Sequence, residues 1–247
     1  MSADDKTALA AHAGAAGAAR AHYAGGVVDD LMVVGVGGQG VIMAAAIIAD
    51  TAMLGGLDVK LSETRGMSQR GGSVSSHIRI GETVVAPSIS PGEVDYLLAF
   101  ESAEGLRLAP SLVPGGVAIV NLQQIVPPLA SQGEFAYPFD AIERMRAEGA
   151  AAGARAAGGE ERAAGGEARA AGYGVIAVDG NAVGEAAGSI KVTGVVLVGA
   201  LSTHLPFAAE TWEKAIAANV PASFLEMNLA AFAAGRHVGA AEGGEPA

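Results

Sequence analysis

The chain has 247 residues, with 15 Lys or Arg against 26 Asp or Glu, so its formal net charge is −11. This balance argues against a nucleic-acid partner, because neutralising phosphates requires a basic face. The sequence contains no cysteine, which excludes disulfides, thiolate zinc sites, cysteine-ligated iron–sulfur clusters and a cysteine nucleophile. An iron–sulfur cluster with which this protein works must therefore belong to a partner.

Three segments contain too few large apolar residues to predict a packed core. Residues 1–27 are rich in alanine and glycine and lack the basic start and apolar run of a signal peptide. They predict a flexible extension of a cytoplasmic protein. Residues 147–172 repeat this composition and predict a flexible, partly helical insert, and residues 237–247 predict a tail. A single domain is expected over 28–236.

The first half of that domain predicts buried strands alternating with helices. Residues 31–49 carry no charge, but four glycines and Gln39 interrupt them, so they indicate strand, turn and helix rather than a membrane span. The apolar runs and alternating patterns predict strands at 30–35, 58–62, 73–80, 95–100 and 116–121 and a helix at 40–54. A turn at 81–82, followed by a short extended piece, predicts a β-hairpin near 73–86.

The second half predicts one more strand and a helical end. The strand is expected at 174–179, and the helices at 192–205, 208–219 and 221–234. We expect Asp179 or Asn181 to cap the helix after that strand, with Glu185 as an anion in its first turn. Trp212 is expected in the core or an interface. The fold class is therefore α/β: a three-layer, mostly parallel, Rossmann-like sheet with a β-hairpin excursion and a C-terminal helical cap.

The loop at 35–40, Gly-Val-Gly-Gly-Gln-Gly, matches the dinucleotide fingerprint between a strand and a helix. In that fingerprint the first glycine makes the turn, the second lets backbone approach a pyrophosphate, and the helix N-terminus favours anions. Asp58 or Glu63 would then meet a ribose. A tight turn without a ligand fits the pattern equally well. Gln39 is atypical of a nicotinamide site and suits a hydrogen bond to a ligand or a facing subunit.

A second loop combines cations, glycines and serines. Between residues 21 and 106 every Lys or Arg lies in the window 60–81, namely Lys60, Arg65, Arg70 and Arg79. Bare backbone N–H groups, short hydroxyl donors and fixed cations together favour an anionic ligand over a solvated charged turn, because glycines and serines rather than carboxylates separate the charges. The candidate binding residues are Gly35, Gly37, Gly38, Gln39 and Gly40 of the first loop, and Arg65, Gly66, Ser68, Gln69, Arg70, Gly71, Gly72 and Ser73 of the second.

The two loops together resemble one family. Gly-Val-Gly-Gly-Gln-Gly at 35–40 and Ser-Glu-Thr-Arg-Gly-Met-Ser-Gln-Arg-Gly-Gly-Ser-Val-Ser-Ser-His-Ile-Arg at 62–79 are similar to the gamma-type domain of 2-oxoacid:ferredoxin oxidoreductases. The resemblance covers about 30–236. As a free-standing chain, the sequence is most similar to the beta subunits of the indolepyruvate branch.

The resemblance implies a reaction in which an aryl 2-oxoacid, coenzyme A and oxidised ferredoxin give acyl-CoA, carbon dioxide and reduced ferredoxin. It places thiamine diphosphate and [4Fe-4S] clusters on an alpha subunit, which agrees with the lack of cysteine here. This chain would be a required, non-catalytic subunit that contacts coenzyme A and meets ferredoxin indirectly. The motif positions that carry over, without atomic roles, are Gly37, Gly38, Gln39, Arg65, Gln69, Arg70, Gly71 and Gly72.

Other functions remain open at this point. A stand-alone NAD(P)-binding oxidoreductase would use the loop at 35–40 but needs a proton donor, and no Tyr-x-x-x-Lys pair is present. Adenylating proteins share the glycine pattern but usually carry a transfer cysteine. A purely structural assembly subunit is the strongest alternative, because both glycine loops would also let another chain approach closely.

Overall fold

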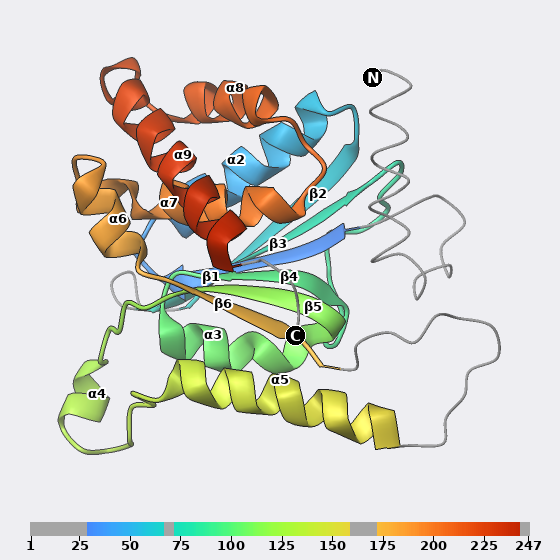
Figure 1. Ribbon diagram of the computed structural model, residues 1–247, viewed down its shortest axis with the longest axis vertical. Coiled ribbons are helices and arrows are strands. Elements are labelled where there is room, and N and C mark those ends of the chain that lie inside the picture. The colour runs from blue at the N-terminus through green and yellow to red at the C-terminus, as the bar shows by residue number, and fades with distance from the viewer. Residues whose placement is uncertain (1–28, 67–71, 159–171, 243–247) are drawn as a thin grey trace.

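The computed structural model describes residues 29–66, 72–158 and 172–242, which form one sheet between two layers of helices (Figure 1). The six strands are β1 (Asp29–Val36), β2 (Asp58–Arg65), β3 (Ser73–Gly81), β4 (Val94–Ala99), β5 (Leu112–Asn121) and β6 (Gly174–Val178). Their order in the sheet is β2-β3-β1-β4-β5-β6. The three-layer α/β architecture is confirmed.

Most neighbouring strands run parallel. β1, β4, β5 and β6 form parallel pairs, whereas β3 is antiparallel to both β1 and β2. The predicted hairpin exists, but its position near 73–86 was wrong. β3 pairs with β2 from Val74 to Gly81, and Val84 instead donates its N–H to the Asp58 carboxylate over 2.9 Å. An eight-residue partner offers a full hydrogen-bond ladder, which a three-residue piece cannot.

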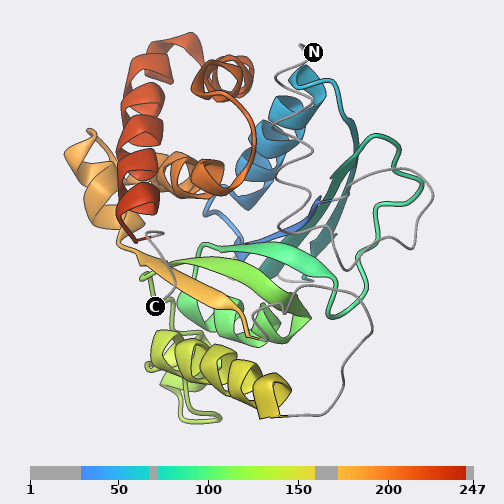
Figure 2. The same cartoon turned by 45° about the vertical axis from the view of Figure 1, so that its right-hand side comes forward.

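The helices divide between the two faces of the sheet (Figures 1 and 2). One face carries α2 (Val41–Leu54), α6 (Gly180–Ala186), α7 (Thr193–Leu201), α8 (Ala209–Asn219) and α9 (Leu225–Glu242), with short turns η3 (Ile190–Val192), η4 (Ser202–His204) and η5 (Ala222–Phe224). The other face carries α3 (Ser102–Leu108) and α5 (Ala141–Gly158), with η2 (Ala109–Ser111) after α3 and α4 (Pro128–Ser131) before α5. We call these the α2 layer and the α3 layer. The helical cap is confirmed.

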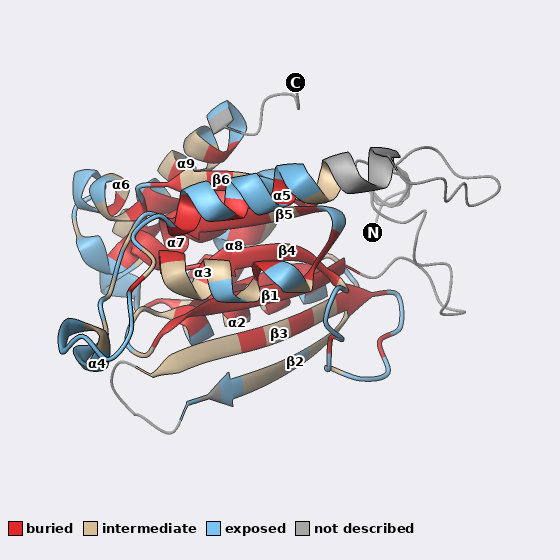
Figure 3. Cartoon of the chain, turned by 90° about the horizontal axis from the view of Figure 1, so that it is seen from below, coloured by how far each residue is buried: buried red, intermediate tan, exposed pale blue. Residues whose placement is uncertain are grey.

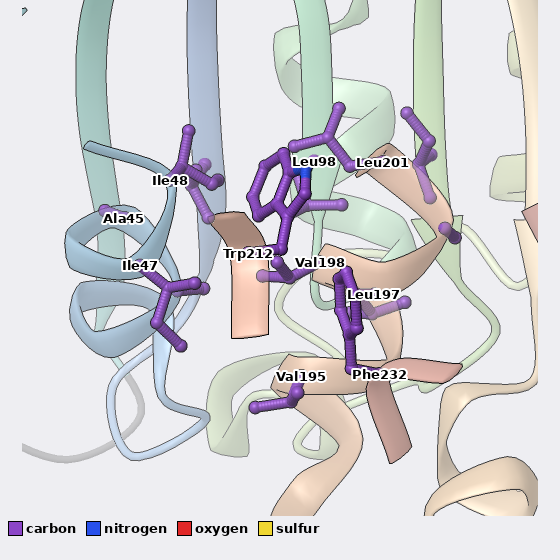
Figure 4. Close-up of a cluster of buried hydrophobic side chains, with 14 of the residues drawn as sticks. Ala45, Ile47, Ile48, Leu98, Val195, Leu197, Val198, Leu201, Trp212 and Phe232 are labelled. Carbon is purple, nitrogen blue, oxygen red and sulfur yellow. The ribbon is translucent and has the colours of Figure 1, made fainter. Parts of the chain in front are cut away.

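The central strand β1 is buried on both faces, which explains its unbroken apolar sequence. Leu31 and Val33 belong to the core beneath the α2 layer, whereas Met32 and Val34 belong to the core beneath the α3 layer. The larger core contains Trp212, which is fully buried among side chains of α2, β4 and α7 (Figure 4). Trp212 is therefore a core residue, as one of the two sequence expectations had it.

Helices α7 and α9 approach each other through glycine. A Cβ atom added at Gly235 would collide with the carbonyl oxygen of Val196, and one added at Gly199 would collide with that of Phe232. No side chain can occupy those positions while the two backbones stay in contact. The apolar sequence of α7 follows from this burial, since all nine of its residues are buried.

Two segments that composition had marked as flexible, the first of them as partly helical, begin as helix. The expected insert at 147–172 begins as the continuation of α5, which reaches Gly158, because alanine is the strongest helix former. The expected tail at 237–247 begins as the last part of α9, where Val238 packs against the α2-layer core. Gly172 is a bend before β6, and residues 159–171, 243–247 and the extension at 1–27 lie outside the described residues.

No helix within the described ranges has both the length and the apolar character needed to cross a membrane.

Candidate functional site

The fold has a topological switch point, where the chain leaves adjacent parallel strands in opposite directions. β1 continues into α2 on one face, whereas its neighbour β4 continues into α3 on the other face (Figure 1). In open α/β sheets, ligands bind at such a switch point, outside the carboxyl ends of the strands. The loop at 35–40 lies there, because it joins β1 to α2.

The glycines of this loop have different roles. Gly38 and Gly40 adopt positive φ angles of 102° and 91°, so they make the turn. Gly35 lies inside β1, where an added Cβ would come within 2.7 Å of the Gln39 Oε1 atom and 2.8 Å of the Phe100 Cβ. The expectation that the first glycine makes the turn was wrong, because β1 extends past it and its lack of a side chain serves close packing.

Gln39 braces the loop from within the chain. Its Oε1 accepts the Val36 N–H over 2.7 Å, while its Nε2 donates to the Phe100 carbonyl over 3.0 Å and to Gln123 Oε1 over 2.8 Å. Both ends of the carboxamide are therefore engaged between the ends of β1, β4 and β5. Gly40 precedes α2 without a side-chain cap, and the first turn of α2 contains no acidic residue. This end of α2 is electrostatically suited to an anion.

The second loop meets the first through backbone. The Gly37 N–H donates to the Gly72 carbonyl over 2.9 Å, and the Gly66 N–H donates to the Ser73 carbonyl over 2.9 Å. The structure thus brings together the described ends of both predicted loops at the carboxyl end of β1. Ser68, Gln69, Arg70 and Gly71 lie outside the described residues, and Arg65 is placed by its backbone as the last residue of β2.

Two charged residues that the sequence analysis missed hold the base of the second loop. The Ser73 hydroxyl donates to Glu104 Oε2 over 2.6 Å and accepts from Arg107 Nη2 over 2.9 Å. Glu104 and Arg107 also form an ion pair of 2.5 Å within α3. The available signal was Arg107, the first cation after the basic window, three residues beyond a glutamate.

The other two cations of the basic window serve the opposite end of the sheet. Lys60 pairs with Asp58 at 2.7 Å, and Arg79 pairs with the buried Asp30 at 2.8 Å. Lys60 lies six residues before Gly66, which along a strand is about 20 Å. Asp58 also lies at that far end, where the neighbouring Lys60 holds the pKa of its carboxyl below the usual range. The window therefore does not concentrate all its charge at the loop.

Neither carboxylate proposed for a ribose is placed as in a dinucleotide site. Asp58 begins β2, at the end away from the loop, and is occupied by Lys60 and Val84. Glu63 lies nearer, but β3 separates β2 from β1. In dinucleotide-binding folds the acidic residue lies at the end of the strand next to the one that leads into the glycine loop. Because β2 is not next to β1 here, this topology argues against that class.

A buried carboxylate follows β4 at the switch point and accepts hydrogen bonds from three separate segments of the chain. Glu101 is 2% exposed and caps α3 by accepting the Glu104 N–H over 2.9 Å. It also accepts the Ile125 N–H over 3.2 Å and the Tyr137 hydroxyl. Burial, followed by this hydrogen bond, raises the pKa of Tyr137 to about 12. The sequence analysis did not find Glu101, because an isolated glutamate after a strand has no local signature.

Polar residues also close the ends of β5 and β6. Asn121 is fully buried, donating to the Phe100 carbonyl over 3.2 Å and accepting the Gly180 N–H over 3.0 Å. Asp179 caps α6 by accepting the Ala182 N–H over 3.0 Å, as expected. Glu185 is not in the first turn of α6, so that expectation was wrong, because the helix is short and Glu185 is near its end.

A family model described as pyruvate ferredoxin/flavodoxin oxidoreductase matches residues 30–238. The chain belongs to this family. Among curated relatives, the indolepyruvate oxidoreductase subunit IorB of Archaeoglobus fulgidus is 38% identical over 83% of this chain and 92% of its own length. The protein of the same name from Thermococcus kodakarensis is 32% identical over 83% of this chain and 93% of its own length.

Solved structures share the fold of this family member at lower identity. The gamma subunit of a keto/oxoacid ferredoxin oxidoreductase from Geobacter sulfurreducens aligns with a TM-score of 0.58 at 23% identity, covering 86% of this chain and 99% of that one. A 2-oxoglutarate:ferredoxin oxidoreductase from Magnetococcus marinus, with 2-oxoglutarate, coenzyme A and succinyl-CoA bound, aligns with a TM-score of 0.60 at 18% identity. That match covers 87% of this chain and 31% of the other.

The described residues limit what this chain offers chemically. Among them, no group of three or more His, Cys, Asp or Glu side chains is placed to hold a metal ion. The switch point instead offers turn glycines and an uncapped helix N-terminus, with Ser73 and Arg107 hydrogen-bonded to each other nearby. Such an arrangement is suited to holding an anionic ligand or a neighbouring chain.

Proposed function

We propose that this chain is the cluster-free, non-thiamine subunit of an indolepyruvate:ferredoxin oxidoreductase. The complex would convert an aryl 2-oxoacid and coenzyme A to acyl-CoA and carbon dioxide, and the two electrons released would reduce ferredoxin. The observation that carries this proposal is similarity along almost the whole domain to proteins named indolepyruvate oxidoreductase subunit IorB, at 32–38% identity.

In this proposal the chemistry at the reacting carbon belongs to an alpha subunit, which carries thiamine diphosphate and [4Fe-4S] clusters. The sequence supports the division of labour, because it contains no cysteine with which to bind such a cluster. This chain would contribute positioning and would be inactive alone. Ferredoxin would accept electrons from the partner's clusters and so meet this chain indirectly.

Coenzyme A is the anionic ligand that we propose for the switch point. The uncapped N-terminus of α2 would favour one of its phosphates, and the second glycine loop would add Arg65 and Arg70. The structural neighbour with coenzyme A bound supports this choice by fold alone. Gly38 and Gly40 would let backbone approach the ligand, because a side chain is disfavoured at both positive φ angles.

A purely structural role in the same complex is the second candidate, and one observation favours it. The Gly37 N–H and the Gln39 carboxamide, which would otherwise contact a ligand, are engaged within this chain. In that case the glycine loops would serve to bring another chain close to the carboxyl end of the sheet.

Anaerobic affinity purification from the native host tests the first claim. A brown eluate absorbing near ~400 nm, from iron–sulfur charge transfer, together with a thiamine-binding partner, would support the complex. A colourless chain without a partner would refute it.

The Arg65→Ala/Arg70→Ala double variant then separates the two roles. Retained assembly with a raised KM for coenzyme A supports ligand binding, whereas loss of the complex supports the structural role. A matched control is Arg144→Ala/Arg146→Ala, which removes two exposed cations of α5 that belong to neither glycine loop.

A further inference from the structure

The segment between β5 and α5 displays apolar side chains to solvent. We call residues 122–139 the arm; Figure 3 shows it, with α4, projecting beyond the sheet as a largely exposed excursion. Of the twelve exposed large hydrophobic side chains among the described residues, five belong to the arm: Leu122, Val126, Leu129, Phe135 and Phe139. A cluster of exposed apolar side chains marks an interaction surface, whereas single exposed apolar side chains are ordinary.

The arm is also nearly free of charge. In a chain of net charge −11, residues 122–133 contain no Asp, Glu, Lys or Arg, and Glu134 is the one charged residue in the whole arm. Aromatic enrichment and charge depletion are the features that distinguish the centre of a protein–protein interface from ordinary surface. Both Phe135 and Phe139 are at least half exposed, at 50% and 64%.

Buried hydrogen bonds hold the arm in place without using these apolar side chains. Glu101 binds the Ile125 N–H and the Tyr137 hydroxyl, and the Ser102 N–H donates to the Gln123 carbonyl over 3.0 Å. Gln124 closes the arm on itself by donating to the Phe139 carbonyl over 3.0 Å. A surface that is already ordered loses less entropy on binding.

The arm is joined directly to the candidate site. Gln39, which braces the glycine loop, donates to Gln123 at the start of the arm over 2.8 Å. Glu101 caps the helix whose Glu104 holds Ser73 of the second loop. Whatever covers the arm therefore lies beside the switch point, next to the two glycine loops.

We propose that the arm is the docking surface for the thiamine-bearing partner subunit, an inference that rests on the proposed function. A second copy of this chain fits less well, because two chains of net charge −11 repel each other. A basic or nucleic-acid partner fits less well because the arm offers almost no charge. The 2-oxoglutarate enzyme shows that this fold also occurs within a chain about three times as long, since the match covers 31% of that chain.

The test compares two double variants in the full chain. Leu129→Ser/Phe135→Ser removes two arm side chains that are each 50% exposed, and Met53→Ser/Leu54→Ser removes two of 54% and 56% exposure at the end of α2. These controls lie toward the amino ends of the strands, because α2 starts at the carboxyl end of β1 and runs back along the sheet (Figure 1). Binding to the purified thiamine-bearing subunit is measured by titration calorimetry, and folding by circular dichroism.

We expect the arm variant to bind at least about tenfold more weakly and the control variant to bind as the unaltered chain does. Hydrogen exchange gives a second measurement. The amides of residues 122–139 should exchange more slowly in the unaltered complex than in the free chain. Equal binding by both variants, or unprotected arm amides, would overturn the assignment while leaving the complex intact.

Two further outcomes are distinguishable. An unaltered chain that sediments as a dimer, and becomes a monomer in the arm variant, would make the occupant a second copy and overturn the assignment. An unaltered chain that binds no thiamine-bearing subunit would instead overturn the proposed function, and the assignment of the arm with it.

Discussion

The α7–α9 contact and the loop at the carboxyl end of β1 both depend on glycine, for different physical reasons. Between the helices, Gly199 and Gly235 leave room for the backbone of the neighbouring helix. In the loop, an added Cβ at Gly38 or Gly40 would meet nothing within 4 Å, but both residues have positive φ angles. One region uses glycine for space and the other for conformation.

This difference separates a rigid contact within the core from a loop that is available to a ligand or a neighbouring chain. The glycines between the helices are committed to the core and cannot serve a ligand. Those of the loop keep open space beside an uncapped helix N-terminus. The substitutions below test that division, beginning with the largest expected effect.

Gly235→Ala should destabilise the protein most. The new methyl group collides with the Val196 carbonyl in a packed contact, so α7 and α9 must separate at a cost of about 3 kcal/mol in the free energy of unfolding. Urea unfolding followed by circular dichroism measures this loss. Gly174→Ala is the control, because its Cβ meets nothing within 4 Å, and its effect should stay within about 0.5 kcal/mol. Similar losses in the two variants would contradict the account.

Gln39→Glu tests whether the carboxamide braces the loop. The variant keeps the shape but places a carboxylate oxygen against the Phe100 carbonyl and Gln123 Oε1, both of which now accept from Nε2. We expect a loss of about 2 kcal/mol at neutral pH, and a smaller loss in acid, where a protonated glutamate can donate again. Gln132→Glu, at an exposed position of the arm, is the control. Unchanged stability of Gln39→Glu would mean that the brace is dispensable.

Arg107→Met tests the support of the second loop. Because the Arg107 side chain is half exposed, losing its pair with Glu104 should cost under about 1 kcal/mol. The base of the loop should loosen nevertheless, so the Gly66 amide, which donates to the Ser73 carbonyl, should exchange its hydrogen faster. Arg144→Met on α5 should leave that exchange rate unchanged. No difference between the two variants would show that Ser73 does not need Arg107.

His77→Gln addresses the polar face of β3 and has the smallest expected effect. Burial lowers the pKa of His77 below its ordinary value of 6.5, with the Asp30 charge opposing that shift. The unfolded chain therefore binds the proton more readily, and the folded state loses stability as the pH falls through about 6.5. The variant should lose less stability between pH 7 and pH 5, as measured by thermal unfolding. Above pH 7 the two curves should run parallel, and a divergence there would contradict the account.

Local patterns predicted much of the fold. The apolar run at 30–35 predicted β1, which spans Asp29–Val36, because a strand buried on both faces has an unbroken apolar sequence. Composition predicted a flexible, partly helical insert at 147–172, and the described residues 147–158 are helical, as the end of α5. That helix is anchored at its start by the buried Ile142 and Met145. The hairpin was misplaced because local pattern alone does not identify the partner of β3.

The candidate site could be predicted in outline. Both glycine loops were identified from the sequence, and their described ends meet through Gly37 and Gly72. Glu101, Glu104 and Arg107 were not predicted, since their roles arise from contacts with residues distant in the sequence, such as Tyr137 and Ser73. Lys60 and Arg79, which were counted in the basic window but not among the binding residues, pair with carboxylates away from the loop.

The sequence by itself determined the fold class, the two glycine loops and the exclusion of metal–thiolate chemistry, because periodicity, glycine and cysteine content act locally. The tertiary structure alone decided that Gly35 packs while Gly38 and Gly40 turn, and that Gln39 is engaged within the chain. It also decided that an apolar arm lies beside the glycine loop. Such facts depend on which backbone atoms come within a few ångströms of each other, and only the folded chain sets those distances.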